Sequence, residues 1–421
     1  MTAATTGGRM RLYASRDYRL WWFGAVISAI GSRVAGVALP IVVLMLTKSA
    51  SQASIVAALG VVPFIVLGLP VGILVDRSKR KLLLGAASLV SMLAIGAIAA
   101  AYLLGSLTMG VIYAAALVCG SAAVVFGVAE VAVLPCLVPK ELFGAASGQA
   151  EMIWGISAIL GPPVAGLLYQ LSVAAPFAAD AVSFGLVGLC VLAIRTPLGA
   201  KPPFPPIKWR RDLGSGLREL RTWHRLRAIT WLTLAGDVLF SGIPLVMIVL
   251  VQSSAGSPAT IGLVFSAAAA GGIIGSVTAN RIEQRIGLRA AVIAKHWLTA
   301  AVFPLLAIGL DPAVIAIVWA FVNFLVSILN VIQMQYLLSV IPADVLGRVQ
   351  SFTAFLINGC APIGIAVTGY VLDRLDGART VLVFSVLLVL FSVYATFSRD
   401  LRTADRPGAE PAEHQPSEAR E

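Results

Sequence analysis

The sequence predicts an all-α integral membrane protein with twelve transmembrane helices, arranged as two parallel six-helix halves. Hydrophobic residues make up 59% of the 421 positions and charged residues only 12%, which lies outside the range of soluble domains. Apolar stretches recur along the whole chain, each long enough to cross a hydrocarbon core of about 30 Å at about 1.5 Å per residue. Glycine and proline positions of the first half return in the second half at a fixed offset.

The apolar stretches follow one another with short polar connections. We expect spans near 20–46, 52–75, 82–104, 108–134, 144–170, 177–195, 228–252, 258–281, 290–310, 313–338, 349–372 and 380–398. These spans divide the chain into an N-terminal six-helix half (1–195), a cytoplasmic basic linker (196–227), a C-terminal six-helix half (228–398) and a disordered cytoplasmic tail rich in proline and glutamate (399–421).

The linker between the halves begins with a proline-rich stretch and continues with leucines at helical spacing among arginines. This pattern predicts a basic amphipathic helix on the inner surface of the membrane. A merely solvated linker is the alternative interpretation.

The net charge of +11 comes from cations in the connections between spans. By the positive-inside rule, their distribution predicts a multi-pass protein of the cell (plasma or inner) membrane with both termini in the cytoplasm. Nucleic acid is not an expected partner, because binding it needs cations gathered on one accessible surface with stacking aromatics. The four cysteines lack paired spacing, so we expect neither a disulfide framework nor a metal site.

A shift of 203 residues superposes the two halves without gaps. Coincident glycines and prolines are informative, because they report helix ends and close backbone approach, whereas leucine and alanine match easily in an apolar chain. We infer one backbone plan for both halves. The coincident pairs are Gly68/Gly271, Gly72/Gly275, Pro139/Pro342, Gly144/Gly347, Gly161/Gly364 and Gly166/Gly369.

The connection after the second span places Gly72 before Asp76, Arg77, Arg80 and Lys81. With the repeat and the basic linker, this Gly-x-x-x-Asp-Arg pattern resembles the loop signature of the major facilitator superfamily. Stretches 18–21, 37–40, 179–184 and 217–221 are similar to its macrolide and siderophore (enterobactin-type) exporter branch. The resemblance covers the whole chain. It implies the major facilitator fold, an efflux antiporter and a role in drug resistance.

Three departures from the family pattern concern coupling. Lys79 stands where the loop usually has glycine, and Ser32 stands where this branch often has aspartate. The fourth span also lacks the membrane-embedded arginine of many proton-coupled relatives. Whether protons drive transport is therefore left open by the sequence.

Ionisable residues inside spans are energetically expensive, so each is a functional candidate. In the superfamily, spans 1, 4, 7 and 10 line the central cavity, and Arg33 and Asp237 fall on spans 1 and 7. The repeat offset places them at similar depth, which predicts an ion pair or a shared ligand. If Asp237 loses Arg33 during transport, it could take up a proton; a permanent structural pair is the alternative. Span 10 adds a polar stripe of Asn323, Ser327 and Asn330.

The resemblance also implies an inner gate, formed by the loop residues Gly72, Asp76, Arg77, Arg80 and Lys81 together with Glu130. Glu130, near the cytoplasmic end of span 4, is expected to meet Arg80. Asp76 is expected to cap the start of span 11 near Val349. The offset pairs Asp76 with Ala279, so the second half lacks an equivalent charged latch.

The fifth span carries Gly155, Gly161, Pro162 and Gly166, which resemble the antiporter signature of the superfamily. Physically, the pattern predicts a bent helix whose bare face packs tightly on a neighbour. Ordinary close packing is the alternative. Asp180 is expected to cap or anchor the outer start of span 6.

These features predict a proton-coupled exporter of amphipathic small molecules, such as macrolide-like drugs or siderophores, that works by alternating access. The alternative is an uncoupled or differently coupled transporter, or channel, for lipids or metabolites. An ATP-driven pump would need a separate nucleotidase, since the chain has no Gly-x-x-x-x-Gly-Lys-Ser/Thr loop. An enzyme is not expected. We expect a monomer without cofactor or metal, whose partners are substrate, protons and the lipid bilayer.

Overall fold

The computed structural model describes residues 12–198, 224–254, 256–308, 311–340 and 343–398, with only the backbone course at 69, 224–230, 340 and 343–351. Within these ranges the chain is helical and contains no strand. Most of the predicted linker helix and the tail from residue 399 onwards lie outside the described residues.

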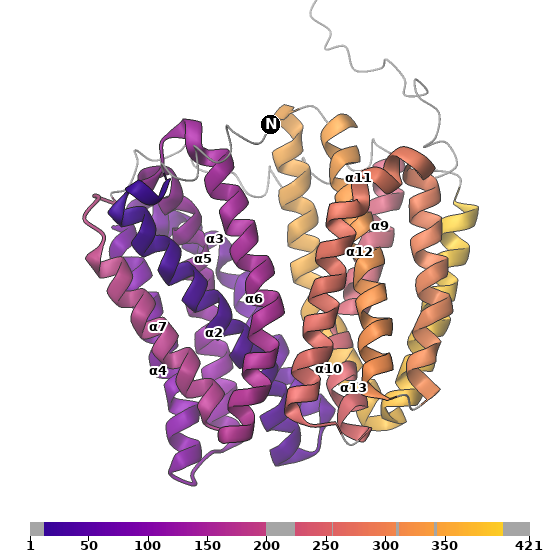
Figure 1. Ribbon diagram of the computed structural model, residues 1–421, viewed down its shortest axis with the longest axis horizontal. Coiled ribbons are helices and arrows are strands. Elements are labelled where there is room, and N and C mark those ends of the chain that lie inside the picture. The colour runs from indigo at the N-terminus through magenta and orange to yellow at the C-terminus, as the bar shows by residue number, and fades with distance from the viewer. Residues whose placement is uncertain (1–11, 199–223, 255, 309–310, 341–342, 399–421) are drawn as a thin grey trace, which may run out of the picture.

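The first half consists of six helices joined by short connections (Figure 1, indigo to magenta). Serines begin two of them: the Oγ atoms of Ser15 and Ser49 accept hydrogen bonds from the amides of Tyr18 and Gln52, which satisfies amides that have no partner inside the helix. The helices are α2 (Arg16–Thr47), α3 (Ala50–Arg77), α4 (Arg80–Leu103), α5 (Met109–Leu137), α6 (Phe143–Leu171, preceded by the 3₁₀ turn Lys140–Leu142) and α7 (Ala175–Ala193).

The second half contains six spans, four of which are joined in pairs through tight reversals. One span is α9 (His224–Ser241) with α10 (Ile243–Ser253), and another is α12 (Pro312–Val340). The remaining two helices, α11 (Pro258–Val302, continued by the 3₁₀ segment Phe303–Ile308) and α13 (Ala343–Phe397), have 45 and 55 residues. At about 1.5 Å per residue, either would be more than twice as long as the hydrocarbon core is thick.

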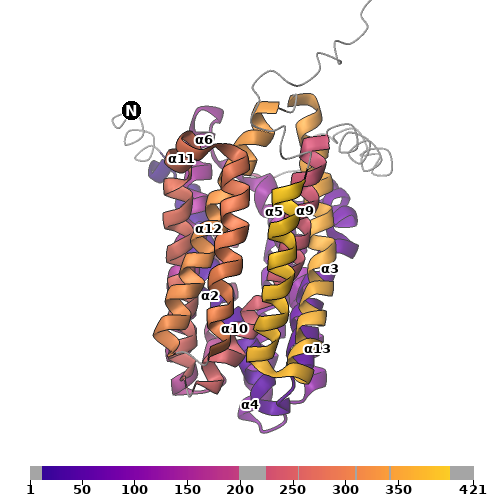
Figure 2. The same cartoon turned by 90° about the vertical axis from the view of Figure 1, so that its right-hand side faces the viewer.

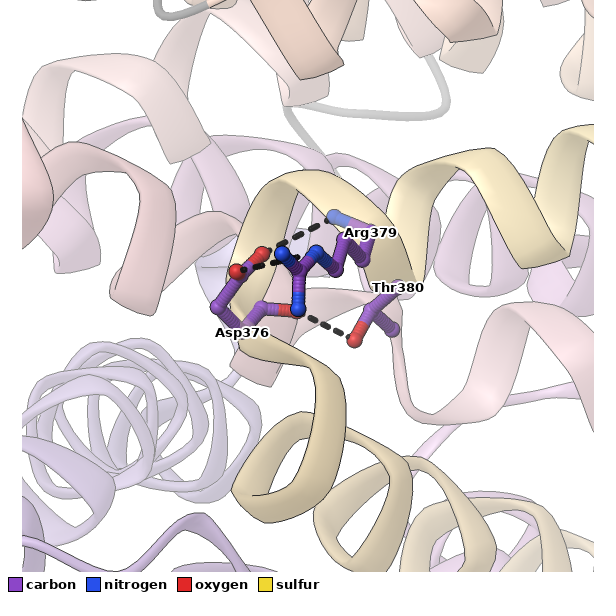
Figure 3. Close-up of polar contacts among 3 residues, drawn as sticks. All are labelled: Asp376, Arg379 and Thr380. Carbon is purple, nitrogen blue, oxygen red and sulfur yellow. Dashed lines mark hydrogen bonds and ion pairs between the residues drawn. The ribbon is translucent and has the colours of Figure 1, made fainter.

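Each of these long helices reverses direction at one residue with positive φ, Gly287 (φ 72°) in α11 and Asp376 (φ 65°) in α13. At the second reversal, Asp376 accepts a hydrogen bond from the Arg379 amide (3.0 Å) and pairs with the Arg379 guanidinium (3.8 Å), as Figure 3 shows. Ten helical stretches of the described chain are long and apolar enough to cross a membrane. Since two of them fold back, the predicted twelve spans are confirmed.

The repeat is visible in the packing of its glycines. Gly161 lies against Ile30 and Arg33 of α2, and Gly364 lies against Val238 and Ser241 of α9. Each therefore packs on the first helix of its own half, where the space left by the missing Cβ lets two backbones approach closely. This pair of coincident glycines therefore reports the same helix contact in both halves.

The second pair of repeated glycines packs across the two halves. Gly166 of α6 touches Pro258 and Ala259 at the start of α11, and Gly369 of α13 touches Ser54 of α3. The halves stand side by side and approach each other towards the lower end of Figure 1; Figure 2 shows the second half from its outer face. The contacts between halves thus run along α6 with α11 and α3 with α13.

The two ends of the molecule differ in the residues that they carry. The motif end carries residues 76–81, and the opposite end carries the connection 104–108 and Asp376. Between the ends, large apolar side chains face outwards: Val131 is 76% exposed and Val277 is 74% exposed. A water-soluble protein would bury such side chains, whereas lipid tails solvate them.

Candidate functional site

A cavity of about 240 Å³ lies inside the second half, between α9, the second part of α11 and α12. Its charged lining residues are Asp237 of α9 and Lys295 of α11. Neutral polar residues complete the wall, together with the rings of Phe240 and Trp319. The neutral polar group comprises Thr233, His296, Asn323, Asn330 and Gln333.

Asp237 and Lys295 interact electrostatically across this cavity. The ion pairs found within 4 Å in the described chain do not include them, so the attraction acts over a longer distance. The Lys295 Nζ lies 5.7 Å from the centroid of the Phe240 ring, within the range of a cation–π contact. Phe240 in turn stacks on Trp319, with centroids 6.4 Å apart and planes at 9°.

Hydrogen bonds fix the polar wall of the cavity. Asn323 donates from Nδ2 to the Trp319 carbonyl (2.9 Å), and Gln333 donates from Nε2 to Thr233 Oγ1 (2.8 Å), which joins α12 to α9. The His296 Nδ1 lies 2.7 Å from the Val292 carbonyl oxygen. Because a carbonyl only accepts, Nδ1 is the donor and Nε2 is the acceptor of the neutral ring.

The predicted residues of the second half fall partly on this cavity. Asp237, Asn323 and Asn330 line it. Ser327 instead faces the first part of α11, because its Oγ lies 3.0 Å from the position that a Cβ on Gly272 would occupy. The predicted stripe on the tenth span is therefore divided between two faces of α12.

The predicted ion pair between Arg33 and Asp237 is not formed in the structure. The Arg33 guanidinium carbon lies 4.3 Å from the centroid of the Trp154 ring, and its side chain packs against Gly161. Both contacts hold Arg33 on α6 of its own half. The cation that faces Asp237 is Lys295, from the same half.

Sequence reasoning missed Lys295 and His296, although both lie within the predicted ninth span. The rule that singled out Asp237, an ionisable residue inside an apolar stretch, applies equally to Lys295. His296 is buried, with 2% of its surface exposed. Applying the rule to every span would have identified both residues.

At the motif end, the buried Arg80 does not meet Glu130. Its Nη1 donates to the Ala132 carbonyl (3.1 Å) and lies 3.5 Å from Cys136 Sγ, so the guanidinium neutralises carbonyl dipoles at the end of α5. Glu130 has no ion-pair partner among the described residues. The expected Arg80–Glu130 contact is therefore absent from this structure.

The remaining residues of the loop signature differ in their contacts. Lys81 Nζ donates to the Ile194 carbonyl (2.8 Å) and so ties α4 to the end of α7. A Cβ on Gly72 would meet no atom within 4 Å. Arg77 is exposed. The contact of Asp76 with the start of α13 near Val349 stays a prediction, because the contacts of 343–351 lie outside the described part.

The opposite end contains a polar connection that the sequence did not predict. The carboxylate of Asp373, near the end of the first span of α13, accepts hydrogen bonds from the amides of Ala50 (2.6 Å) and Ser51 (3.0 Å) and from Ser49 Oγ (2.8 Å). An acidic side chain from the second half thereby caps the N-terminus of α3 in the first half. The two halves are held together at this end.

The fifth predicted span, α6, packs on its neighbours through its glycines. Gly161 packs on α2, whereas Gly166 packs on α11. The Pro162 carbonyl meets Gly262 of α11, and a Cβ on Gly155 would lie 3.5 Å from Ile273 Cδ1. The close approach fits both interpretations of the motif, and its role in antiport stays a prediction.

Asp180 does not cap its helix. It lies five residues inside α7, only 1% exposed, and its Oδ1 accepts a hydrogen bond from Ser183 Oγ (3.1 Å). A Cβ on Gly31 of α2 would lie 2.6 Å from the same Oδ1. The expected capping role is therefore wrong, and Asp180 is a buried group between α7 and α2.

Residues 21–365 match the family model described as Major Facilitator Superfamily. The chain is 25% identical over 397 residues to macrolide efflux protein A of Streptococcus pyogenes, covering 91% of this chain and 96% of that protein. It is also 25% identical over 398 residues to the multidrug efflux pump Tap of Mycobacterium tuberculosis, covering 91% and 93%.

Solved structures with the same fold are more distant in sequence. A crystal structure of the nucleoside transporter NupG superposes with a TM-score of 0.68 at 12% identity, covering 90% of this chain and 98% of that one. A bacterial homologue of the iron transporter ferroportin in the inward-facing state gives a TM-score of 0.69 at 16% identity, covering 90% and 98%.

Proposed function

Because the chain belongs to the Major Facilitator Superfamily, we propose that it is a proton-coupled exporter of amphipathic small molecules, such as macrolide-like drugs or siderophores. The chain is a multi-span membrane transporter and not an enzyme. Export is supported by the efflux names of relatives that match 91% of the chain. The proposal concerns the coupling to protons, the direction of transport and the substrate.

The observation that carries the proposal is the pair of opposite charges at a cavity inside the membrane-spanning part, Asp237 and Lys295. Charges at that depth are costly, and they persist where they handle an ion or a substrate. Apolar contact is supplied by Phe240 and Trp319 and polar contact by Asn323. One charged head group and a ring fit about 240 Å³, whereas a macrolide-sized molecule would need more space than this cavity provides.

The proposed transport cycle is alternating access, with the motif end and both termini in the cytoplasm. In this assignment the hydrogen bonds of Asp373 to the start of α3 close the outer side. The separation of Arg80 from Glu130 suits an inner side that is open for loading. Opening of the outer side requires the Asp373 bonds to break, and substrate and protons bias the equilibrium between the two states by binding them unequally.

A susceptibility panel tests the exporter proposal. Bacteria that lack their main efflux pumps are transformed with the wild-type gene, with an Asp237→Asn variant or with an empty vector. Inhibitory concentrations are then measured for macrolides and for other amphipathic drugs. We expect wild-type cells to tolerate at least one class better than vector cells, and Asp237→Asn cells to lose that tolerance at equal membrane expression. Equal susceptibility of wild-type and vector cells to every compound would oppose export of these drugs.

A further inference from the structure

Lys295 is a cation within a membrane-spanning helix, and its surroundings balance one positive charge. Asp237 from α9 supplies the negative charge. The neighbouring helix α12 contributes neutral amides to the cavity, Asn323, Asn330 and Gln333, and α11 itself contributes the additional titratable group His296. Among the described lining residues, Asp237 is therefore the sole carboxylate available to any cation in this cavity.

The place that the Lys295 ammonium occupies has the composition of a cation-binding site. Its Nζ lies over the face of Phe240 at 5.7 Å, and Phe240 stacks on Trp319, which also lines the cavity. Aromatic faces combined with a carboxylate are the groups that recognise substituted ammonium ions. A substrate with a protonated amine would find its preferred surroundings at the position that this side chain already fills.

Two cations cannot share this place at low cost. With both ammonium groups present, one carboxylate would face two positive charges in a cavity enclosed by membrane-spanning helices, and the excess charge would be poorly solvated. The excess is removed if the Lys295 nitrogen releases a proton: an N–H bond breaks, its electron pair stays on Nζ, and the proton passes to water.

We propose that Lys295 is a tethered competitor of a cationic substrate, and that its Nζ, rather than the Asp237 carboxylate, carries the proton exchanged for that substrate. The proposal rests on the exporter function proposed above. One substrate cation enters the site as one proton leaves Nζ, and one proton returns to Nζ after the substrate has left on the other side. The exchange is one for one and carries no net charge.

Binding to the purified protein in lipid nanodiscs tests this assignment without requiring transport. The probe is benzyltrimethylammonium, which has a permanent charge and no proton to lose, so any proton released comes from the protein or its lipid. Calorimetry in buffers of different ionisation enthalpy counts the protons released. We expect about one proton per bound probe for the wild type, and empty nanodiscs provide the blank. Binding without proton release would overturn the proposal.

Two substitutions distinguish a competitor from a structural lysine. Lys295→Arg keeps a cation that does not give up its proton, so probe affinity should fall at least tenfold. Lys295→Met removes the competing charge at similar length, so affinity should equal or exceed that of the wild type. A structural role predicts the reverse order, with arginine as the better replacement. Thermal unfolding establishes that each variant is folded.

Two further outcomes would also sink the assignment. If neither the wild type nor Lys295→Met binds the probe saturably, the cavity is not a cation site. If Asp237→Asn binds as tightly as the wild type, the carboxylate is not the counter-charge. Either result leaves the exporter proposal standing if the wild-type gene still confers drug tolerance, so the two proposals can fail independently.

Discussion

Removal of the negative charge of Asp373 should favour opening of the end of the molecule that carries residues 104–108, opposite the motif end. In the structure the Asp373 carboxylate accepts three hydrogen bonds from the start of α3, at 2.6, 2.8 and 3.0 Å. An Asp373→Asn side chain keeps one acceptor oxygen but loses the charge, and its NH₂ group cannot accept from the amides. Hydrogen bonds to a charged group stabilise by about 1.5–3 kcal/mol each, and neutral ones by about 0.5–1.5 kcal/mol.

The exposure of Asp373 to solvent reduces this difference, because water and salt screen the charge. We therefore expect the substitution to destabilise the state in which the halves meet at this end by about 1–2 kcal/mol in total. That loss corresponds to about a 5- to 30-fold change in the ratio of the closed to the open population at the opposite end. Substrate release at that end should become easier, and re-closure should become slower.

Pulsed electron resonance between two spin labels measures these populations. The labels are attached at this end to Leu104→Cys in the first half and Ile308→Cys in the second half, because these positions are 80% and 69% exposed. The four native cysteines are first replaced. Asp376→Asn is the matched control, because Asp376 pairs with Arg379 of its own half (Figure 3). The reasoning fails if Asp373→Asn leaves the distance distribution unchanged, or if Asp376→Asn shifts it equally.

Three further outcomes are expected. Asp237→Asn should abolish coupled drug efflux while membrane expression stays normal, and full efflux by this variant would make Asp237 structural. Gly166→Ala places a Cβ 2.5 Å from the Cα of Ala259, so it should destabilise the protein by about 1–3 kcal/mol. Gly155→Ala is the control: its Cβ meets only the flexible end of a side chain at 3.5 Å, so the melting temperature should change little. A double-mutant cycle of Arg33→Gln with Asp237→Asn in thermal stability should give a coupling below about 0.5 kcal/mol, and a larger coupling would indicate the ion pair that the structure lacks.

The number of spans and the repeat were predictable, because both depend on local properties of the chain. Apolar length fixes the spans, and glycines mark the places where helix backbones touch, as Gly161 and Gly166 do. The reversals at Gly287 and Asp376, whose backbone angles are not helical, also fall between predicted spans.

The interaction partners of buried side chains were harder to predict than the depth of those side chains in the membrane. The repeat offset placed Arg33 opposite Asp237, but it carries no information on side-chain direction, and Arg33 turns to Trp154 within its own half. The partner of Asp237 instead comes from α11, and nothing in the spacing along the chain relates positions 237 and 295. Asp373 resembles any acidic residue at a helix end until the fold brings α3 beside it.

The most direct test of proton-coupled export uses everted membrane vesicles that contain the wild-type protein. Such vesicles expose the cytoplasmic face, and an acidic interior supplies the proton gradient in its cellular direction. We predict that a labelled macrolide accumulates inside, and that nigericin, which collapses the pH gradient, abolishes the accumulation. Unchanged accumulation after the gradient has collapsed would contradict proton coupling and favour an uncoupled or differently coupled transporter.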